Sequence, residues 1–205
     1  MDPTVLHSNI NLLNFGYKSD FMNVIIVHGS WGSPKENWFP YLKSELEKLG
    51  HKVFVPKFPT PIGQKLDVWL DILKTYDEYL DENSIMIGHS MGCALILRKL
   101  ELLYKPIKAT FLVGGFIRDL WDGKYSEIVD TFFEKPFDWE KIKSNAGYFE
   151  IYQSDNDEYV TVSMGEEIAK NLGGKLVIVK NAGHFNEDSG YAKFPLLLGN
   201  IKTVL

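Results

Sequence analysis

Apolar residues along this chain form short runs that alternate with longer segments of helical periodicity. Runs rich in β-branched residues lie at 23–27, 52–55, 84–87, 109–113, 148–153 and 175–179. Segments with apolar residues spaced three and four apart lie at 36–49, 64–81, 91–104 and 162–172, and we expect a last helix after Gly190. The first pattern predicts buried strands and the second predicts amphipathic helices. Because parallel strands need long crossover connections, the alternation predicts an α/β fold with a mostly parallel central sheet and helices on both faces.

One segment interrupts this rhythm. Residues 116–145 separate two predicted strands and carry several large aromatic residues among many charges: Trp121, Phe132, Phe133, Phe137 and Trp139. Two interpretations stay open, crossover helices with buried aromatic rings or a small cap over a binding pocket. No internal repeat or linker divides the chain, so residues 1–205 are predicted to form a single domain.

Composition narrows the class of protein. Hydrophobic residues make up 45% and charged residues 24% of the chain, as in soluble globular proteins. The net charge of −5 argues against nucleic-acid or anionic membrane partners, which need clustered cations. No apolar stretch reaches the roughly 18 residues of a membrane-spanning helix, and residues 1–20 do not resemble a secretory signal. We therefore expect a cytoplasmic protein, by default a monomer.

The single cysteine, Cys93, has no partner for an internal disulfide and leaves too few thiolates for a structural zinc site. It follows Ser90 by three positions on a predicted helix, where a small buried packing residue is expected. No metal or cofactor is expected.

The sequence GHSMG joins the strand 84–87 to the helix 91–104. In such a sharp turn Ser90 is held at the apex, while Gly88 and Gly92 keep the crossing backbone free of side chains. The hydroxyl would then stand at the carboxyl edge of the sheet beside the start of a helix, where developing negative charge is favoured. A tight turn with a capping serine would use the same residues. Other parts of the chain must decide between the two.

A serine hydroxyl becomes a nucleophile only when a base removes its proton, and that base needs an orienting acid. Among the five histidines, His184 in NAGHF follows the strand 175–179 and should reach the same sheet edge as Ser90. His7, His51 and His89 are interpreted as surface or structural residues. For the acid, Asp157 in SDNDEYV is favoured over Asp155, which resembles a turn former.

The stretch VHGSWGS follows the first strand and offers flexible backbone for binding an oxyanion. The N–H groups of Ser30 and Met91 are the expected donors, and Trp31 is the less favoured one. Trp31, His28 and Trp121 are the candidates for the wall of the substrate pocket.

The order Ser90, Asp157, His184 is the order of α/β-hydrolases. Through VHGSWGS, GHSMG, SDNDEYV and NAGHF the chain resembles that superfamily, and its tail GHFNEDSGYAKFP is similar to small serine hydrolases grouped with retinoblastoma-binding protein 9. The resemblance implies a compact α/β-hydrolase fold with Ser90 as nucleophile, His184 as base and Asp157 as its partner. The only cysteine lies in MGCAL and not in an L-x-C-x-E motif, so no retinoblastoma-protein partner is inferred.

These residues lead to the hypothesis of a serine hydrolase that acts on small acyl substrates, most simply carboxylic esters, through an acyl-enzyme. An amidase, peptidase, thioesterase or lyase could use the same residues, since the pocket decides what enters. A noncatalytic binding protein with the same fold is the remaining alternative.

Overall fold

The computed structural model describes residues 21–120 and 123–205. Its strands are β1 (Asn23–Val27), β2 (Lys52–Phe54), β3 (Ser84–His89), β4 (Ala109–Val113), β5 (Phe149–Ser154) and β6 (Lys175–Val179). Its α-helices are α1 (Phe39–Lys48), α2 (Leu66–Lys74), α3 (Met91–Leu100), α4 (Ser126–Phe133), α5 (Trp139–Ser144), α6 (Val162–Leu172) and α7 (Pro195–Lys202). Two short 3-10 helices cover Asp77–Tyr79 and Glu187–Ser189.

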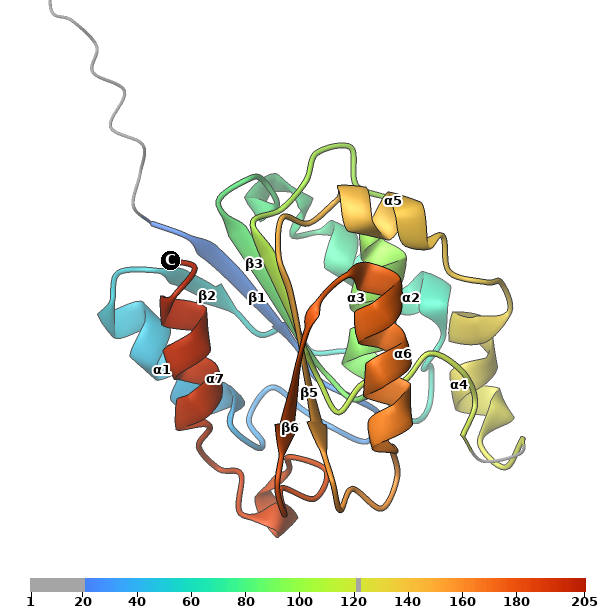
Figure 1. Cartoon of the computed structure of the whole chain (residues 1–205). Coiled ribbons are helices and arrows are strands. Elements are labelled where there is room, and N and C mark those ends of the chain that lie inside the picture. Colours follow the sequence, from blue (N-terminus) through green and yellow to red (C-terminus); the bar gives the residue numbers. More distant parts are fainter. Residues whose placement is uncertain (1–20, 121–122) are drawn as a thin grey trace, which may run out of the picture.

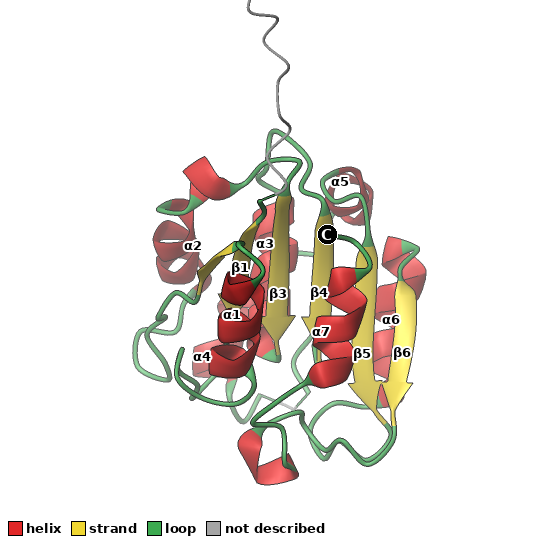
Figure 2. Ribbon diagram, turned by 90° about the vertical axis from the view of Figure 1, so that its left-hand side faces the viewer, coloured by secondary structure: helices red, strands yellow, loops and turns green. Residues whose placement is uncertain are grey.

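The strands form one sheet in the order β2-β1-β3-β4-β5-β6, and every neighbouring pair is parallel. Figure 2 shows the strand arrows pointing in the same direction. Helices α1 and α7 cover one face, while α2, α3 and α6 lie on the other (Figures 1 and 2). The parallel sheet with helices on both faces, as predicted from the apolar rhythm, is confirmed.

Each face of the sheet has its own hydrophobic core, and alternation along the strands supplies both. In β1, Val24 and Ile26 pack toward α1 and α7, whereas Ile25 and Val27 pack toward α2 and α3. This alternation follows from the two-residue period of side chains in a strand. Burial on both faces explains why the strands read as continuous apolar runs.

Three predicted helices are shorter than their periodicity suggested, and the one expected over 91–104 is α3, which ends at Leu100. Helix α1 begins at Phe39 and not at residue 36, because Asn37 has φ +54°, a left-handed conformation that does not fit a right-handed helix. The predicted helix 64–81 is divided into α2 and the 3-10 helix Asp77–Tyr79. Element type was therefore easier to predict than element boundaries.

The segment 116–145 contains α4 and α5, which pack near α3 as parts of the crossover between β4 and β5. Phe132 and Ile142 are buried in the same core as α3. Three of its residues, Phe116, Tyr125 and Val129, also line a cavity at the carboxyl edge of the sheet. Residues 116–145 thus form crossover helices and also supply part of the cavity wall.

Candidate active site

Ser90 occupies the sharp turn between β3 and α3. Its backbone has φ +54° and ψ −124°, a conformation that non-glycine residues rarely adopt. A methyl group on Gly92 would lie 2.4 Å from the carbonyl oxygen of Val27, and one on Gly88 would lie 2.9 Å from the backbone nitrogen of Cys93. Both glycines are therefore steric requirements of this turn, as the sequence suggested. Cys93 itself is fully buried, and burial raises the pKa of its thiol.

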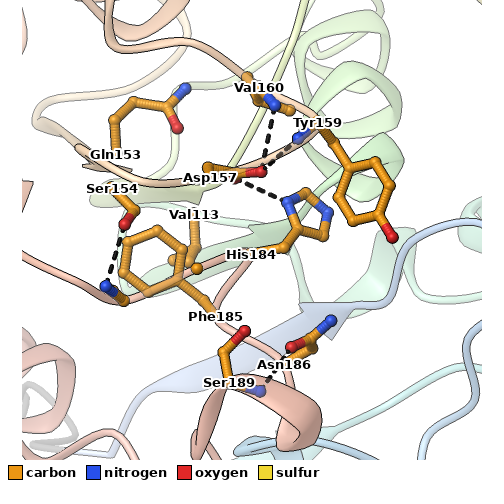
Figure 3. Close-up of polar contacts among 12 residues, drawn as sticks. Val113, Gln153, Ser154, Asp157, Tyr159, Val160, His184, Phe185, Asn186 and Ser189 are labelled. Atoms are coloured by element: carbon orange, nitrogen blue, oxygen red, sulfur yellow. Dashed lines mark hydrogen bonds and ion pairs between the residues drawn. The ribbon is translucent and has the colours of Figure 1, made fainter.

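Asp157 and His184 lie in the loops that follow β5 and β6, and their side chains meet (Figure 3). The distance from His184 Nδ1 to Asp157 Oδ2 is 2.8 Å. Because a carboxylate oxygen accepts, the ring nitrogen donates its proton to it. In the neutral ring this leaves Nε2 unprotonated and able to accept a proton. The hydrogen bond to Asp157 therefore favours the tautomer of His184 that a general base requires.

Backbone groups hold the other carboxylate oxygen of Asp157. Oδ1 accepts hydrogen bonds from the backbone N–H groups of Tyr159 (2.8 Å) and Val160 (3.1 Å), and the Asp157 side chain is fully buried. Asp155, the other acid weighed from sequence, is exposed, and its Oδ1 accepts from the backbone N–H of Asn181 at 2.8 Å. The structure thus brings Asp157, and not Asp155, to His184.

Ser90 and His184 line the same cavity, which has a volume of about 560 Å³. Its wall combines backbone from the loop after β1, aromatic rings and a rim of polar residues: Gly29, Ser30, Trp31, Gly32, Glu36, Asn37, His89, Phe116, Tyr125, Val129, Tyr159, Asn186, Glu187 and Asp188. The cavity lies where α1 and α3 leave neighbouring strands on opposite faces of the sheet. Ligand sites in open α/β sheets lie at such switch points.

The segments that carry the two expected oxyanion donors adjoin Ser90. A methyl group on Gly29 would come within 3.2 Å of Ser90 Oγ, so the loop leading to Ser30 packs closely against the serine. Met91 is the first residue of α3, where backbone N–H groups have no partner within the helix. The backbone N–H of Trp31 instead donates to Thr60 Oγ1 at 2.7 Å. This contact favours Ser30 over Trp31 as donor.

The pocket residues expected from sequence have different outcomes. Trp31 lines the cavity, is 54% exposed and packs edge-on against Tyr125, with 5.3 Å between ring centroids. His28 does not line it, so that prediction is wrong: His28 is fully buried, its Nδ1 donates to the Gly29 carbonyl at 2.8 Å, and its Nε2 accepts from the Phe58 N–H at 3.0 Å. Trp121 lies outside the described residues.

His89 has a contact that sequence reasoning missed. Its Nε2 donates to the backbone carbonyl of His184 at 2.8 Å, and the two rings are 5.0 Å apart. Burial, with a smaller contribution from the neighbouring His184, lowers the pKa of His89 to about 3. His89 is therefore neutral at pH 7 and ties the loop of the candidate base to the turn of the candidate nucleophile. No local signal could reveal a bond between residues so far apart in sequence.

Tyr159 is a second residue not singled out from the sequence. Its ring packs edge-on against the His184 imidazole, with 5.1 Å between centroids, and it lines the cavity. Figure 3 shows it beside His184, two residues after Asp157. The tyrosine thus narrows the space beside the imidazole.

The part of the chain that the structure describes contains neither a metal-binding cluster nor a membrane-spanning helix. Across residues 21–120 and 123–205, no three His, Cys, Asp or Glu side chains gather as a metal site would require. Within the same ranges, every helix is too short or too polar to cross a bilayer.

Comparison with known sequences gives consistent relatives. A family model described as serine hydrolase matches residues 24–202. The Bacillus subtilis (strain 168) protein YdeN is 34% identical over 176 residues, which cover 85% of this chain and 91% of YdeN. The serine hydrolase RBBP9 of Rattus norvegicus is 29% identical over 184 residues, covering 88% of this chain and 94% of RBBP9.

Solved structures agree with the sequence comparison. The crystal structure of the Bacillus subtilis ydeN gene product superposes with a TM-score of 0.83 and 32% identity, covering 89% of this chain and 98% of that one. The Bacillus subtilis carboxylesterase CesB superposes with a TM-score of 0.61, over 91% of this chain and 84% of its own. Its identity is 16%, so it speaks for a shared fold alone.

Proposed function

This chain belongs to the serine hydrolase family and has a compact α/β-hydrolase fold, and from that premise we propose that it hydrolyses small carboxylic esters through Ser90, His184 and Asp157. The observation that carries the proposal is the Asp157–His184 hydrogen bond of 2.8 Å. It orients the imidazole so that Nε2 can accept a proton in the cavity that Ser90 also lines.

The reaction begins when Ser90 Oγ attacks the ester carbonyl carbon and its proton passes to His184 Nε2. The carbonyl oxygen takes the negative charge, and the N–H groups of Ser30 and Met91 stabilise it. Collapse of this intermediate breaks the bond to the alcohol oxygen, which receives the proton from His184. A water molecule, deprotonated by the same imidazole, then attacks the acyl carbon; the bond to Ser90 Oγ breaks, this oxygen takes the proton back from His184, and the acid leaves. Throughout, Asp157 holds the ring and stabilises its positive charge.

The cavity suggests the size of the acyl group. Its volume of about 560 Å³ suits a small molecule and not a long polymer chain. Trp31, Tyr125 and Tyr159 supply flat apolar walls around the serine and histidine. These walls favour short or planar acyl groups over branched ones.

Labelling with a fluorophosphonate probe tests the nucleophile. The wild-type protein should gain one probe mass, and peptide mapping should locate it on Ser90. Ser90→Ala should abolish labelling, while Ser163→Ala, which changes an exposed serine on α6, should not. A wild-type protein inert to the probe at neutral pH would instead favour a noncatalytic binding protein.

A substrate panel tests the reaction type. We expect p-nitrophenyl esters of short acids to turn over faster than aminoacyl amides and alkyl thioesters. If amides or thioesters react while esters stay at the buffer rate, the triad assignment survives and the esterase proposal does not.

A further inference from the structure

The loop after β1 is fastened to the loop after β2 by hydrogen bonds. The Phe58 N–H donates to His28 Nε2 (3.0 Å), and the Trp31 N–H donates to Thr60 Oγ1 (2.7 Å). The Trp69 indole N–H, from α2, donates to the Pro59 carbonyl at 2.8 Å. The loop that carries Ser30 is thus held by a second loop more than 25 residues further along the chain.

Gln64 joins these two loops to the pocket wall. Its side chain is buried, with 1% of the residue exposed. Its Nε2 donates both to Ser30 Oγ (2.7 Å) and to the Ile128 carbonyl of α4 (2.8 Å), and its Oε1 accepts from Thr60 Oγ1 (2.6 Å). Both amide hydrogens and the carbonyl oxygen therefore have partners.

The orientation of the Gln64 amide follows from its partners. The Ile128 carbonyl can only accept, so the atom facing it must be the nitrogen. The oxygen then faces the Thr60 hydroxyl, whose own oxygen accepts from the Trp31 N–H. A continuous line of hydrogen bonds runs from α4 through Gln64 and Thr60 to the backbone of Trp31. A side branch from Gln64 ends on Ser30.

We propose that Gln64 is a positioning residue that sets the Ser30–Trp31 backbone so that the Ser30 N–H points to the oxyanion. This inference rests on the proposed function, because it concerns the same acyl chemistry. The Thr60 hydroxyl accepts the hydrogen bond of the Trp31 N–H, and the Gln64 amide is hydrogen-bonded to both the Thr60 and the Ser30 hydroxyl. The Ser30 N–H is then the donor that the loop can offer beside Ser90.

Oxyanion stabilisation depends on donors that are in place before the reaction begins. Trp31 has φ +55°, so this loop adopts a conformation that its own sequence does not favour. Contacts from outside the loop must hold it, and Gln64 is the buried side chain that contacts it and α4 together. Removing the amide should let the donor drift and slow the step in which charge develops.

The test compares Gln64→Met, which keeps the side-chain length and removes its hydrogen bonds, with Asn145→Leu. Asn145 is a matched control because its amide is also buried and also donates to backbone carbonyls, Leu100 (2.7 Å) and Leu103 (3.2 Å), beyond the amino-terminal end of β5. Thr60→Val is a second variant, which removes both bonds of the Thr60 hydroxyl, to Gln64 and to Trp31, and keeps the bond from Gln64 to Ser30. Thermal melts report the stability of every variant.

Two rates separate positioning from folding: phosphonylation of Ser90 by a small fluorophosphonate, and kcat for p-nitrophenyl acetate, each per active site in the native state. We expect Gln64→Met to lower both by about tenfold or more, since losing an oxyanion donor outright costs roughly 100-fold or more. KM should change less than kcat. Thr60→Val should move both rates in the same direction, and Asn145→Leu should leave them near wild type.

If Gln64→Met and Thr60→Val slow neither rate more than Asn145→Leu does, the inference is wrong while the proposed function stands. Should Gln64→Met fail to fold, Thr60→Val decides by the same criterion. A wild-type protein that is neither labelled at Ser90 nor active on esters would overturn both the inference and the proposed function.

Discussion

Replacing Asp157 by Asn should remove most of the activity while preserving the fold. The two backbone N–H groups of Tyr159 and Val160 must still face an oxygen, so they fix how the new amide lies. Its NH₂ group then takes the place of Oδ2 and faces His184 Nδ1. That nitrogen must become an acceptor, which moves the ring proton to Nε2. The imidazole can then no longer take the proton of Ser90.

The size of the loss follows from this change of tautomer. The same substitution in a Ser-His-Asp triad lowers kcat by roughly 10⁴-fold, which corresponds to about 5 kcal/mol of transition-state stabilisation. Stability should change little by comparison, because the two backbone hydrogen bonds persist. A charge-assisted bond becomes a neutral one, at a cost of about 1 kcal/mol.

The assay measures kcat and KM on p-nitrophenyl acetate, with a thermal melt of each variant. Asp155→Asn is the matched control, since Asp155 is exposed and accepts a bond from the Asn181 N–H instead of His184. We expect it to retain activity within about twofold, as surface substitutions do. An Asp157→Asn variant with more than about a tenth of wild-type kcat would refute the tautomer argument.

Three further predictions concern the turn around Ser90. The folded-state pKa of His89 is about 3, below its ordinary 6.5, so below pH 6.5 the unfolded chain binds a proton that the native state excludes. The free energy of unfolding should therefore fall by about 1.4 kcal/mol per pH unit below 6.5. Urea unfolding at pH 7.5 and pH 5 measures this fall, which should be smaller by about 2 kcal/mol in His89→Gln than in the wild type. An unchanged difference would contradict this. Gly92→Ala should lower the stability of the protein by about 2 kcal/mol or more, because its methyl group would lie 2.4 Å from the Val27 carbonyl oxygen. Gly199→Ala on α7 is the control: its methyl group meets nothing within 4 Å, so it should stabilise the helix slightly. Equal melting temperatures of the two variants would refute the steric argument. Cys93 should react with iodoacetamide only after unfolding, because burial raises its pKa; rapid modification of the native protein, followed by mass spectrometry, would show otherwise.

Much of the fold could be predicted from the sequence because its signals are local. Four strand or helix ranges match the structure at both ends: β1, β4, β6 and α6. Parallel strands bring their carboxyl ends to one edge, so Ser90, Asp157 and His184 could be placed there together before any coordinates. Boundaries such as the start of α1 were missed because the left-handed backbone of Asn37, with φ +54°, has no clear signal in the apolar periodicity.

The pairing of side chains across the site depended on tertiary structure. The sequence favoured Asp157 over Asp155, but their contexts are similar, and the positions of the surrounding backbone N–H groups show which one faces His184. His28 follows a strand at the right edge, yet its ring points into the contact with Phe58 and not into the cavity.

By itself, then, the sequence determined the order of the elements and the edge of the sheet where chemistry-bearing residues gather, because periodicity and turn residues act over a few positions. The tertiary structure decided which acid is hydrogen-bonded to His184 and which carbonyl accepts the hydrogen bond of His89. It also decided how Gln64 joins the loops after β1 and β2 to α4. Those contacts link residues 27 to 95 positions apart. Hydrogen bonds of this kind depend on distances that only packing of the helices against the sheet can set.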